Sequence, residues 1–317
     1  MKAAVVQSFD HPPVLTDFPR PVPESNEVLI RVEAAALSQL ALAQASGRHY
    51  SSGSVPFVPG ADGVGRLEDG QRVYFAFPRA PWGAMAEFTT VHHDLVVPLP
   101  AEADPLTIAA IANPAMSSWA ALTERANFKA DESVLINGAN GTSGRLAIRI
   151  ARILGARRVV AIARNKDARA ELESLGADAF IALSQSPEHV VAEIAREAER
   201  GIDVVLDYLW GTPAEYVLQA LMAQAKTSEP RPVRFVNIGS LAGASMSLAA
   251  AALRSTRIEL MGSGLGSLDR RTLVKSVAGV ITAARSNPLP IESIAAPIEE
   301  LQAHWKADSG PRVVFTF

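Results

Sequence analysis

The sequence of 317 residues contains no cysteine, which excludes disulfide bonds and every metal site that depends on thiolate ligands. Its six histidines are scattered, and only His92 and His93 are adjacent. Because neighbouring residues in a strand point to opposite faces, these two are not expected to share a ligand. We therefore predict that the chain holds no metal ion.

Long apolar runs and a strong excess of charge are also missing. No stretch approaches the roughly 20 apolar residues that cross a bilayer, and the N-terminal MKAAVVQSFD lacks the apolar region of a secretory signal. The formal net charge of −3 argues against nucleic acid or an anionic membrane as the main partner. With the absence of cysteine, these features predict a cytoplasmic protein with neither partner.

Proline and glycine punctuate residues 1–110, and short β-prone runs lie between them. These runs are at 27–34, 71–77, 86–91 and 95–99. The pattern is typical of a compact, mostly antiparallel β domain with long loops.

From about residue 115 to residue 262, strand-like and helix-like patterns alternate. Strands are predicted at 133–137, 158–163, 179–183, 203–208, 233–238 and 257–262. Strands that alternate with helices in this way predict an α/β fold with a doubly wound parallel sheet of the Rossmann type.

The chain is long for one core, so two domains are expected. A helix near 269–286 is followed by a strand at 312–317, which we expect to pair with the first domain's sheet to satisfy its backbone. The domains expected are a catalytic one over 1–115, a dinucleotide-binding one over 116–265, and a return to the first over 266–317.

The segment 133–144, SVLINGANGTSG, joins a buried strand to a helix through a glycine turn. Such a turn exposes backbone N–H groups and the positive end of the helix dipole to a dinucleotide pyrophosphate. The residues predicted to form this cradle are Gly138, Asn140, Gly141, Thr142, Ser143 and Gly144. The spacing is G-x-x-G-x-x-G rather than G-x-G-x-x-G, so an ordinary strand–turn–helix connection is the alternative.

Arg164, Asn165 and Lys166 follow the second strand of this unit, where a Rossmann fold reads the adenosine ribose. An acidic residue there would favour NAD(H), but the first acid is Asp167. Two cations suit a 2′-phosphate, which predicts NADP(H) as cofactor. The alternative is a solvated basic turn.

The order of motifs resembles the medium-chain dehydrogenase/reductase superfamily, in particular its zinc-free quinone oxidoreductase branch, which is zeta-crystallin-like. The matching segments are EVLIRVEAAALS (27–38), VPGADGVG (58–65), GAMAEFTTV (83–91), VLINGANGTSG (134–144), ESLGAD (173–178), GIDVVLDYLWG (201–211), VNIGSLAG (236–243) and ELMGSG (259–264). The resemblance implies that the first domain is GroES-like.

The departures from the zinc-dependent members concern their metal ligands. Ser38 stands where those enzymes carry a cysteine ligand, and Gly60-Ala61-Asp62 replaces their Gly-His-Glu. A catalytic zinc needs three protein ligands, which this set does not supply. The resemblance then implies hydride transfer from NADPH to a quinone or an α,β-unsaturated carbonyl.

The resemblance also suggests candidate catalytic residues. Tyr50 lies where related reductases place a tyrosine over the substrate, although it could equally be a surface-loop residue, and His49 beside it is a possible acid or a solvated histidine. Ser38 occupies a position where quinone reductases have asparagine and could donate to an oxyanion. Asn113 and Ser117 could line the pocket or cap the following helix.

The resemblance implies that two further loops approach the nicotinamide. The alternative is that their glycine and serine residues serve only to form turns. These loops hold Ile238, Gly239 and Ser240, then Gly262, Ser263 and Gly264. Relatives also hold the adenosine phosphate with a lysine and a tyrosine, but this chain has Ala168 and Leu183 there, which leaves more of the binding to the basic turn.

The last strand of the sheet, ELMGSG, is expected at the edge where family members pair into homodimers. Three functions are compatible with the sequence. The first is an NADPH-dependent reductase of quinones or conjugated carbonyls, the second a zinc-free enzyme for another carbonyl substrate, and the third a non-catalytic NADPH-binding protein.

Overall fold

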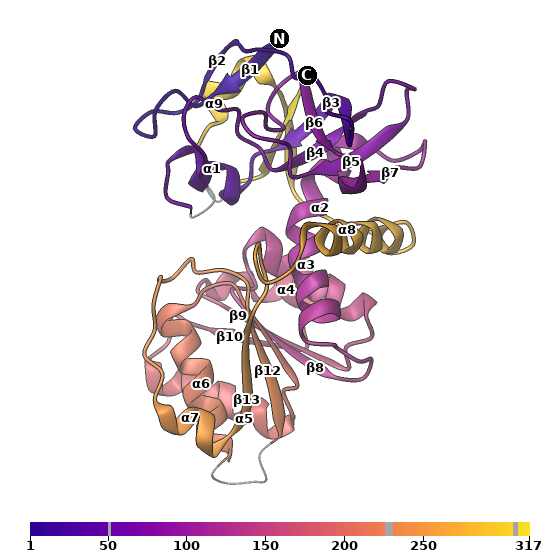
Figure 1. The fold of residues 1–317 in the computed structure, drawn as a ribbon. Helices are drawn as coiled ribbons and strands as arrows, with labels where there is room; N and C mark the ends of the chain where they lie inside the picture. Colours follow the sequence, from indigo (N-terminus) through magenta and orange to yellow (C-terminus); the bar gives the residue numbers. More distant parts are fainter. Residues whose placement is uncertain (50–51, 226–230, 307–309) are drawn as a thin grey trace. The chain divides into compact units, whose positions relative to one another are not determined.

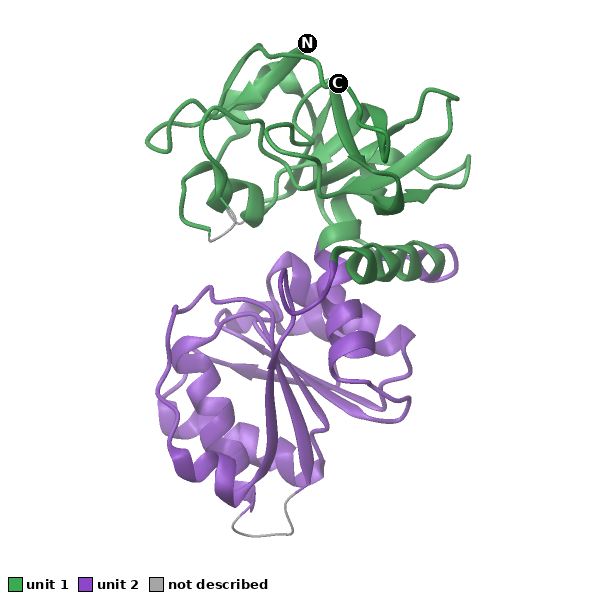
Figure 2. Cartoon of the chain, in the orientation of Figure 1, with its two compact units in different colours: residues 1–113, 270–282, 290–317 green, residues 114–269, 283–289 purple. Residues whose placement is uncertain are grey.

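The computed structural model describes residues 1–49, 52–225, 231–306 and 310–317. The chain forms two compact units, shown in green and purple in Figure 2. The first comprises residues 1–113, 270–282 and 290–317, and the second comprises residues 114–269 and 283–289.

The second unit is built on a six-stranded sheet in which every pair of neighbouring strands is parallel (Figure 1). Its strands are β8 (Ser133–Asn137), β9 (Arg158–Ala163), β10 (Ala179–Ala182), β11 (Val204–Asp207), β12 (Pro232–Asn237) and β13 (Arg257–Gly262). They lie in the order β10-β9-β8-β11-β12-β13, which confirms the predicted doubly wound sheet. The middle of β8 is completely buried because a parallel sheet is covered on both faces.

Helices of the second unit follow the strands in alternation. They are α3 (Thr142–Ile153), α4 (Arg169–Ser174), α5 (Pro187–Arg200), α6 (Gly211–Ala225) and α7 (Ala250–Ser255), with a 3₁₀ turn η3 (Lys166–Ala168) before α4. In α3, Leu146, Ala147, Ile150 and Ala151 are buried, and this helical spacing of apolar residues is what fastens the helix to the sheet.

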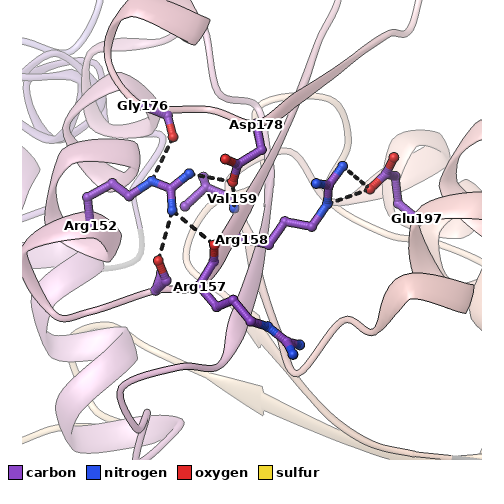
Figure 3. A network of polar contacts seen from close by, with 8 residues as sticks. Arg152, Arg157, Arg158, Val159, Gly176, Asp178 and Glu197 are labelled. Atoms are coloured by element: carbon purple, nitrogen blue, oxygen red, sulfur yellow. Dashed lines mark hydrogen bonds and ion pairs between the residues drawn. The ribbon is translucent and has the colours of Figure 1, made fainter.

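A network around Arg152 fastens α3 to the amino ends of β9 and β10 (Figure 3). The Arg152 guanidinium donates to the carbonyl oxygens of Gly176 and Ala156, both at 2.8 Å, and pairs with the Asp178 carboxylate. The same carboxylate accepts the Val159 N–H at 2.7 Å. This network lies at the opposite ends of the strands from the glycine turn, so we interpret it as structural.

The helix α2 (Pro105–Ala120) carries the chain from the first unit into the second and continues as a π-helical turn over Ala121–Arg125. Asp104 caps its start by accepting the Thr107 N–H at 2.9 Å, and Pro105 occupies the first turn. The suggestion that Asn113 or Ser117 caps this helix is therefore wrong, because both lie in its interior.

The first unit contains a seven-stranded sheet and a separate pair, β1 (Lys2–Val5) with β2 (Val14–Asp17). The strands of the larger sheet are β3 (Glu27–Ala36), β4 (Asp62–Arg66), β5 (Arg72–Ala76), β6 (Phe88–His92), β7 (Val96–Pro98), β14 (Ser293–Pro297) and β15 (Arg312–Thr316). All pairings are antiparallel except that of β14 with β15. β15 pairs with β3 as predicted, with Val314 opposite Ala36.

Several helices and 3₁₀ turns complete this unit. They are α1 (Gln39–Ala45), η1 (His93–Leu95), α8 (Arg270–Ala284, whose last residues belong to the second unit), η4 (Ile298–Glu300) and α9 (Leu301–His304). The expectation that His92 and His93 point to opposite faces is wrong. β6 ends at His92, the 3₁₀ turn η1 begins at His93, and the two rings stack with their centroids 4.4 Å apart.

Among the described residues, none of the helices combines the length and the apolar character required to cross a bilayer.

Candidate functional site

The three glycines of the turn after β8 have different physical roles. Gly138 has φ +97°, a left-handed conformation that a side chain disfavours. A Cβ on Gly144 would lie 2.3 Å from the Gly138 carbonyl oxygen, so this position allows α3 to pack closely against the turn. A Cβ on Gly141 would meet only that same oxygen, at 3.8 Å, which leaves the space above it open. These are the three roles that glycine has in a dinucleotide-binding turn.

The start of α3 offers backbone donors at this open position. Gly141 is the N-cap residue, it is exposed, and no side-chain hydrogen bond caps the helix there. The N–H groups of the first helical turn, from Thr142, Ser143 and Gly144, have no partner within an α-helix. Such groups together with the helix dipole bind phosphate. The structure thus brings the predicted cradle residues together in one turn.

Backbone bonds attach the glycine turn to the end of β9. The N–H groups of Gly138 and Ala139 both donate to the Ile162 carbonyl oxygen, at 3.0 and 2.8 Å. This oxygen lies two residues before Arg164, so the basic turn and the glycine turn leave neighbouring strands at the same edge of the sheet.

Arg164, Asn165 and Lys166 are all exposed. Neither Arg164 nor Lys166 has an ion pair with any residue of the described ranges. The Asn165 side-chain oxygen accepts the Asp167 N–H at 3.0 Å and so caps the 3₁₀ turn η3. The two cations are thus presented to solvent on a turn whose shape Asn165 fixes.

Arg145 contacts the predicted cradle, and sequence reasoning missed it. Its guanidinium donates to the carbonyl oxygen and to the side-chain oxygen of Asn140, at 3.0 and 2.9 Å, and pairs with Glu171 at 2.5 Å. Arg145 therefore fixes both the backbone and the side chain of Asn140 within the glycine turn. In the sequence it looked like an ordinary polar residue of an amphipathic helix.

A buried carboxylate organises the carboxyl ends of the central strands. Asp207, at the end of β11, accepts hydrogen bonds from the side-chain amides of Asn137 and Asn237, at 2.9 and 3.0 Å. It also accepts the N–H groups of Leu209 and Trp210 at 3.2 Å. Burial raises the pKa of Asp207 on balance, although these hydrogen bonds act in the opposite direction.

The predicted nicotinamide loops are attached to this same edge. The N–H groups of Ile238 and Gly239 donate to the Asp207 carbonyl oxygen at 2.7 and 3.2 Å, and the Ser263 N–H donates to the Asn237 carbonyl oxygen at 2.8 Å. Gly262 offers its carbonyl oxygen to Arg125 Nε at 2.7 Å, and Ser240 is exposed. All the predicted cofactor residues therefore lie at the carboxyl edge of one sheet, where open α/β folds bind ligands.

Ser117 is held inside the second unit by two contacts. Its hydroxyl donates to the Pro114 carbonyl oxygen at 2.7 Å, and its oxygen lies 3.4 Å from the Tyr208 hydroxyl. Because the Ser117 proton is already engaged, Tyr208 is the donor of the second contact. Burial raises the pKa of Tyr208 to about 12, which keeps this hydroxyl protonated.

The remaining candidate catalytic residues belong to the first unit. Ser38 is buried and caps α1 by accepting the Ala41 N–H at 3.0 Å. Burial lowers the pKa of His49, which favours its neutral form. Tyr50 lies outside the described residues.

A buried polar cluster surrounds Asp62 at the start of β4. Its carboxylate, 5% exposed, accepts the Tyr74 hydroxyl at 3.2 Å and the side-chain amide of Asn113 at 2.9 Å. Burial raises the pKa of Asp62, whereas Asn113, the positive charge of Arg312 and Tyr74 lower it by a smaller amount. Asn113 thus serves as a partner of Asp62 rather than as a helix cap.

The raised pKa of Asp62 predicts a pH-dependent stability. The folded protein favours the protonated Asp62 carboxyl. The stabilisation that this carboxyl gives to the folded state is therefore fully present below its unfolded pKa, near 3.8, and is lost as pH rises through its folded pKa. The free energy of unfolding of the parent minus that of Asp62→Asn should therefore decrease with rising pH, which urea unfolding between pH 3.5 and about 7 would measure. A difference that does not vary with pH would contradict the prediction.

Asp104 provides a control of opposite sign. Burial acts to raise its pKa, but hydrogen bonds from Thr107 and from the backbone of Leu106 lower it on balance. The free energy of unfolding of the parent minus that of Asp104→Asn should therefore increase as pH rises from below the folded pKa of Asp104 to above its unfolded pKa.

Comparison with known proteins places the chain in a family. The family described as zinc-binding dehydrogenase matches residues 144–279. A probable NADPH-dependent quinone reductase of Emericella nidulans is 30% identical over an alignment that covers 99% of both chains. The protein belongs to the quinone oxidoreductase branch of the medium-chain dehydrogenase/reductase superfamily. It is therefore an oxidoreductase.

Other relatives agree with this placement. The quinone oxidoreductase of Lama guanicoe is 31% identical over an alignment that covers 66% of each chain. The crystal structure of the quinone oxidoreductase of Thermus thermophilus, also solved as its complex with NADPH, has a TM-score of 0.80 at 27% identity and covers both chains fully. The structure of AibC, with a TM-score of 0.83 at 20% identity, shows the shared fold alone.

The residues at the zinc position of this superfamily do not fit a zinc ion. Ala61 has no donor atom, the Ser38 oxygen caps a helix, and the Asp62 carboxylate is held by Tyr74 and Asn113. Zinc in proteins prefers thiolate, imidazole and carboxylate ligands in sets of three or four. The matched family is described as zinc-binding, but these three residues do not offer a zinc ion such a set of ligands.

Proposed function

We propose that this member of the family is an NADPH-dependent reductase of quinones or conjugated carbonyls that works without zinc. The observation that carries the proposal is an open glycine turn at Gly141 together with two exposed cations, Arg164 and Lys166, that have no ion pair within the described residues. The similarity to a probable NADPH-dependent quinone reductase of Emericella nidulans, and to a quinone oxidoreductase of Thermus thermophilus solved with NADPH, supports NADPH as the cofactor and a quinone as the substrate.

The residues of the second unit fit NADP(H). The turn at 138–144 would bind the pyrophosphate through backbone N–H groups, and Arg164 and Lys166 would bind the 2′-phosphate. The loops at 238–240 and 262–263 would flank the nicotinamide. When bound, the reduced nicotinamide supplies the hydride. Arg145 would keep Asn140 in the shape that the pyrophosphate requires, since it holds that residue at two atoms.

Hydride addition to a quinone or an enone leaves negative charge on an oxygen, which then needs a proton. We propose Tyr50 and Ser38 as donors to that oxygen. Ser117 remains a third candidate, but its proton would first have to leave the Pro114 carbonyl oxygen. A water molecule is the alternative proton source if none of the three contributes.

The domain division over 1–115, 116–265 and 266–317 and a cytoplasmic location are part of the same proposal. A homodimer is also proposed, because β13 is at the edge of the six-stranded sheet formed by the described residues, and an edge strand can pair with a second chain. We propose no nucleic acid or membrane partner, in keeping with the small net charge.

A second function has one supporting observation. The Ser117 proton is already donated to the Pro114 carbonyl oxygen, and Ser38, whose oxygen caps a helix, is a weak acid. A non-catalytic NADPH-binding protein would need no proton donor.

A cofactor-by-acceptor panel on the purified protein tests these proposals. We expect consumption of NADPH with 1,4-quinones and short 2-enals, no consumption with saturated ketones, and no loss of rate in a metal chelator. Turnover of saturated ketones would instead favour another carbonyl reductase. Tight NADPH binding with no turnover on any acceptor would favour the non-catalytic protein. Loss of activity in the chelator would contradict zinc independence.

A further inference from the structure

An exposed group of three residues, His92, His93 and Asp94, lies where β6 turns into η1. One potential ligand atom from each residue lies within 4.8 Å of the other two. The group belongs to the first unit, whereas the dinucleotide turn belongs to the second. It also shares no residue with Ser38, Ala61 and Asp62, the positions that correspond to the zinc ligands of related enzymes.

The hydrogen bonds of His93 fix its tautomer. Its Nδ1 lies 2.9 Å from the Asn26 carbonyl oxygen, and a carbonyl can only accept, so Nδ1 carries the hydrogen. In the neutral ring Nε2 is then a lone-pair donor, and it lies 3.2 Å from a carboxylate oxygen of Asp94. Two lone-pair atoms at this distance repel each other unless a cation or a proton lies between them.

The lone pair of His92 Nδ1 is already used in a backbone hydrogen bond, which a metal ion would have to replace. This Nδ1 accepts the Asp94 N–H at 3.2 Å and lies 3.7 Å from the other Asp94 carboxylate oxygen. The stacked rings hold both imidazoles on the same side of the turn. The Asn26 carbonyl also accepts the His93 N–H, at 3.0 Å, so the backbone of the turn is fixed as well. Three potential ligand atoms therefore lie close together in one turn.

We propose that His92, His93 and Asp94 form a binding site for a divalent transition-metal ion such as Zn²⁺ or Ni²⁺. Two imidazoles and one carboxylate are a donor set that such ions prefer. The bond from His93 Nδ1 to a backbone carbonyl is the outer contact that orients a metal-binding histidine. The site is partly exposed, so water can fill the remaining coordination positions. This proposal replaces the expectation from sequence that the chain holds no metal.

Arg271, in the first turn of α8, competes with the metal ion for Asp94. Its Nη2 lies 2.5 Å from the Asp94 Oδ2, and its side chain is 73% exposed. When no metal is bound, the guanidinium neutralises the carboxylate. A divalent ion must displace this group or bind beside its positive charge, which weakens binding. The affinity should therefore rise when Arg271 is replaced by an uncharged residue.

Calorimetric titration of the untagged full chain with ZnCl₂, and separately with NiCl₂, tests the site. We expect one ion per chain. His93→Ala and Asp94→Asn should each weaken binding by at least about 10–100-fold, the loss seen when even an outer contact is removed. Arg271→Gln should tighten binding severalfold. Circular dichroism would verify that each variant is folded.

His189→Ala is the matched control, because His189 is also an exposed histidine beside a carboxylate, with Glu193 at 3.5 Å, but belongs to no such group among the described residues. Its affinity should equal that of the parent. The proposal is overturned if the parent binds no ion at a ratio of one, if His93→Ala binds as the parent does, or if Arg271→Gln weakens binding.

Discussion

Replacing both Arg164 and Lys166 by alanine should raise the dissociation constant for NADPH by about 100-fold or more and change that for NADH by only a few-fold. Each charge-assisted hydrogen bond to a phosphate is worth about 1.5–3 kcal/mol, and 1.4 kcal/mol corresponds to a factor of ten. The two cations have no ion pair among the described residues, so nothing else in this part of the chain is disturbed when they are removed. Fluorescence titration with both cofactors measures the effect.

Arg169→Ala is a suitable control for this double variant. Arg169 is also exposed and lies close by in the sequence, but it already pairs with Glu173 at 3.4 Å and its guanidinium lies over the Phe180 ring. Its loss should change both affinities little. If the double variant weakens NADPH and NADH equally, the 2′-phosphate assignment fails.

Alanine at Gly144 should lower the free energy of unfolding by about 2–3 kcal/mol, at the upper end of the usual cost of overpacking. The added Cβ would lie 2.3 Å from the Gly138 oxygen and 2.6 Å from the Ala139 Cα, and backbone atoms cannot move aside as a side chain can. The turn would have to open, so dinucleotide binding should be lost as well. Urea unfolding and a fluorescence titration measure the two effects.

Gly141→Ala is the matched variant in the same turn. Its Cβ would meet its nearest neighbour at 3.8 Å, so stability should stay within about 1 kcal/mol of the parent, the usual range for an N-cap change. NADPH should nevertheless bind about tenfold or more weakly, because the methyl group occupies the space through which a phosphate approaches the backbone. Equal affinity of Gly141→Ala and the parent would show that the phosphate does not approach there.

The parallel sheet could be predicted from sequence because its strands are short apolar runs that alternate with helical patterns. The strand at 133–137 begins and ends as predicted. The start of α2 was missed, although Asp104-Pro105 is a cap followed by a proline, a signal that a local search could have found. Asn113 and Ser117 offer a competing signal further along the chain, since both residue types also favour caps.

The Asp62 cluster could not be predicted in this way. Its members, Asp62, Tyr74, Asn113 and Arg312, come from distant parts of the sequence and meet only when the antiparallel sheet has formed and α2 lies beside it. Local patterns carry no information about such contacts. The same reason explains Arg145, whose role depends on the path of the turn before it.

The pairing of β15 with β3 sets the order in which a newly made chain can be completed. Residues 114–269 leave the ribosome before residues 312–316, so the parallel sheet can close while β3 still lacks its partner near Ala36. Contacts between such distant segments form late because loop closure is costly. During synthesis the protein therefore passes through a stage with one finished domain and one open strand edge, and such an edge is prone to aggregation until β15 arrives.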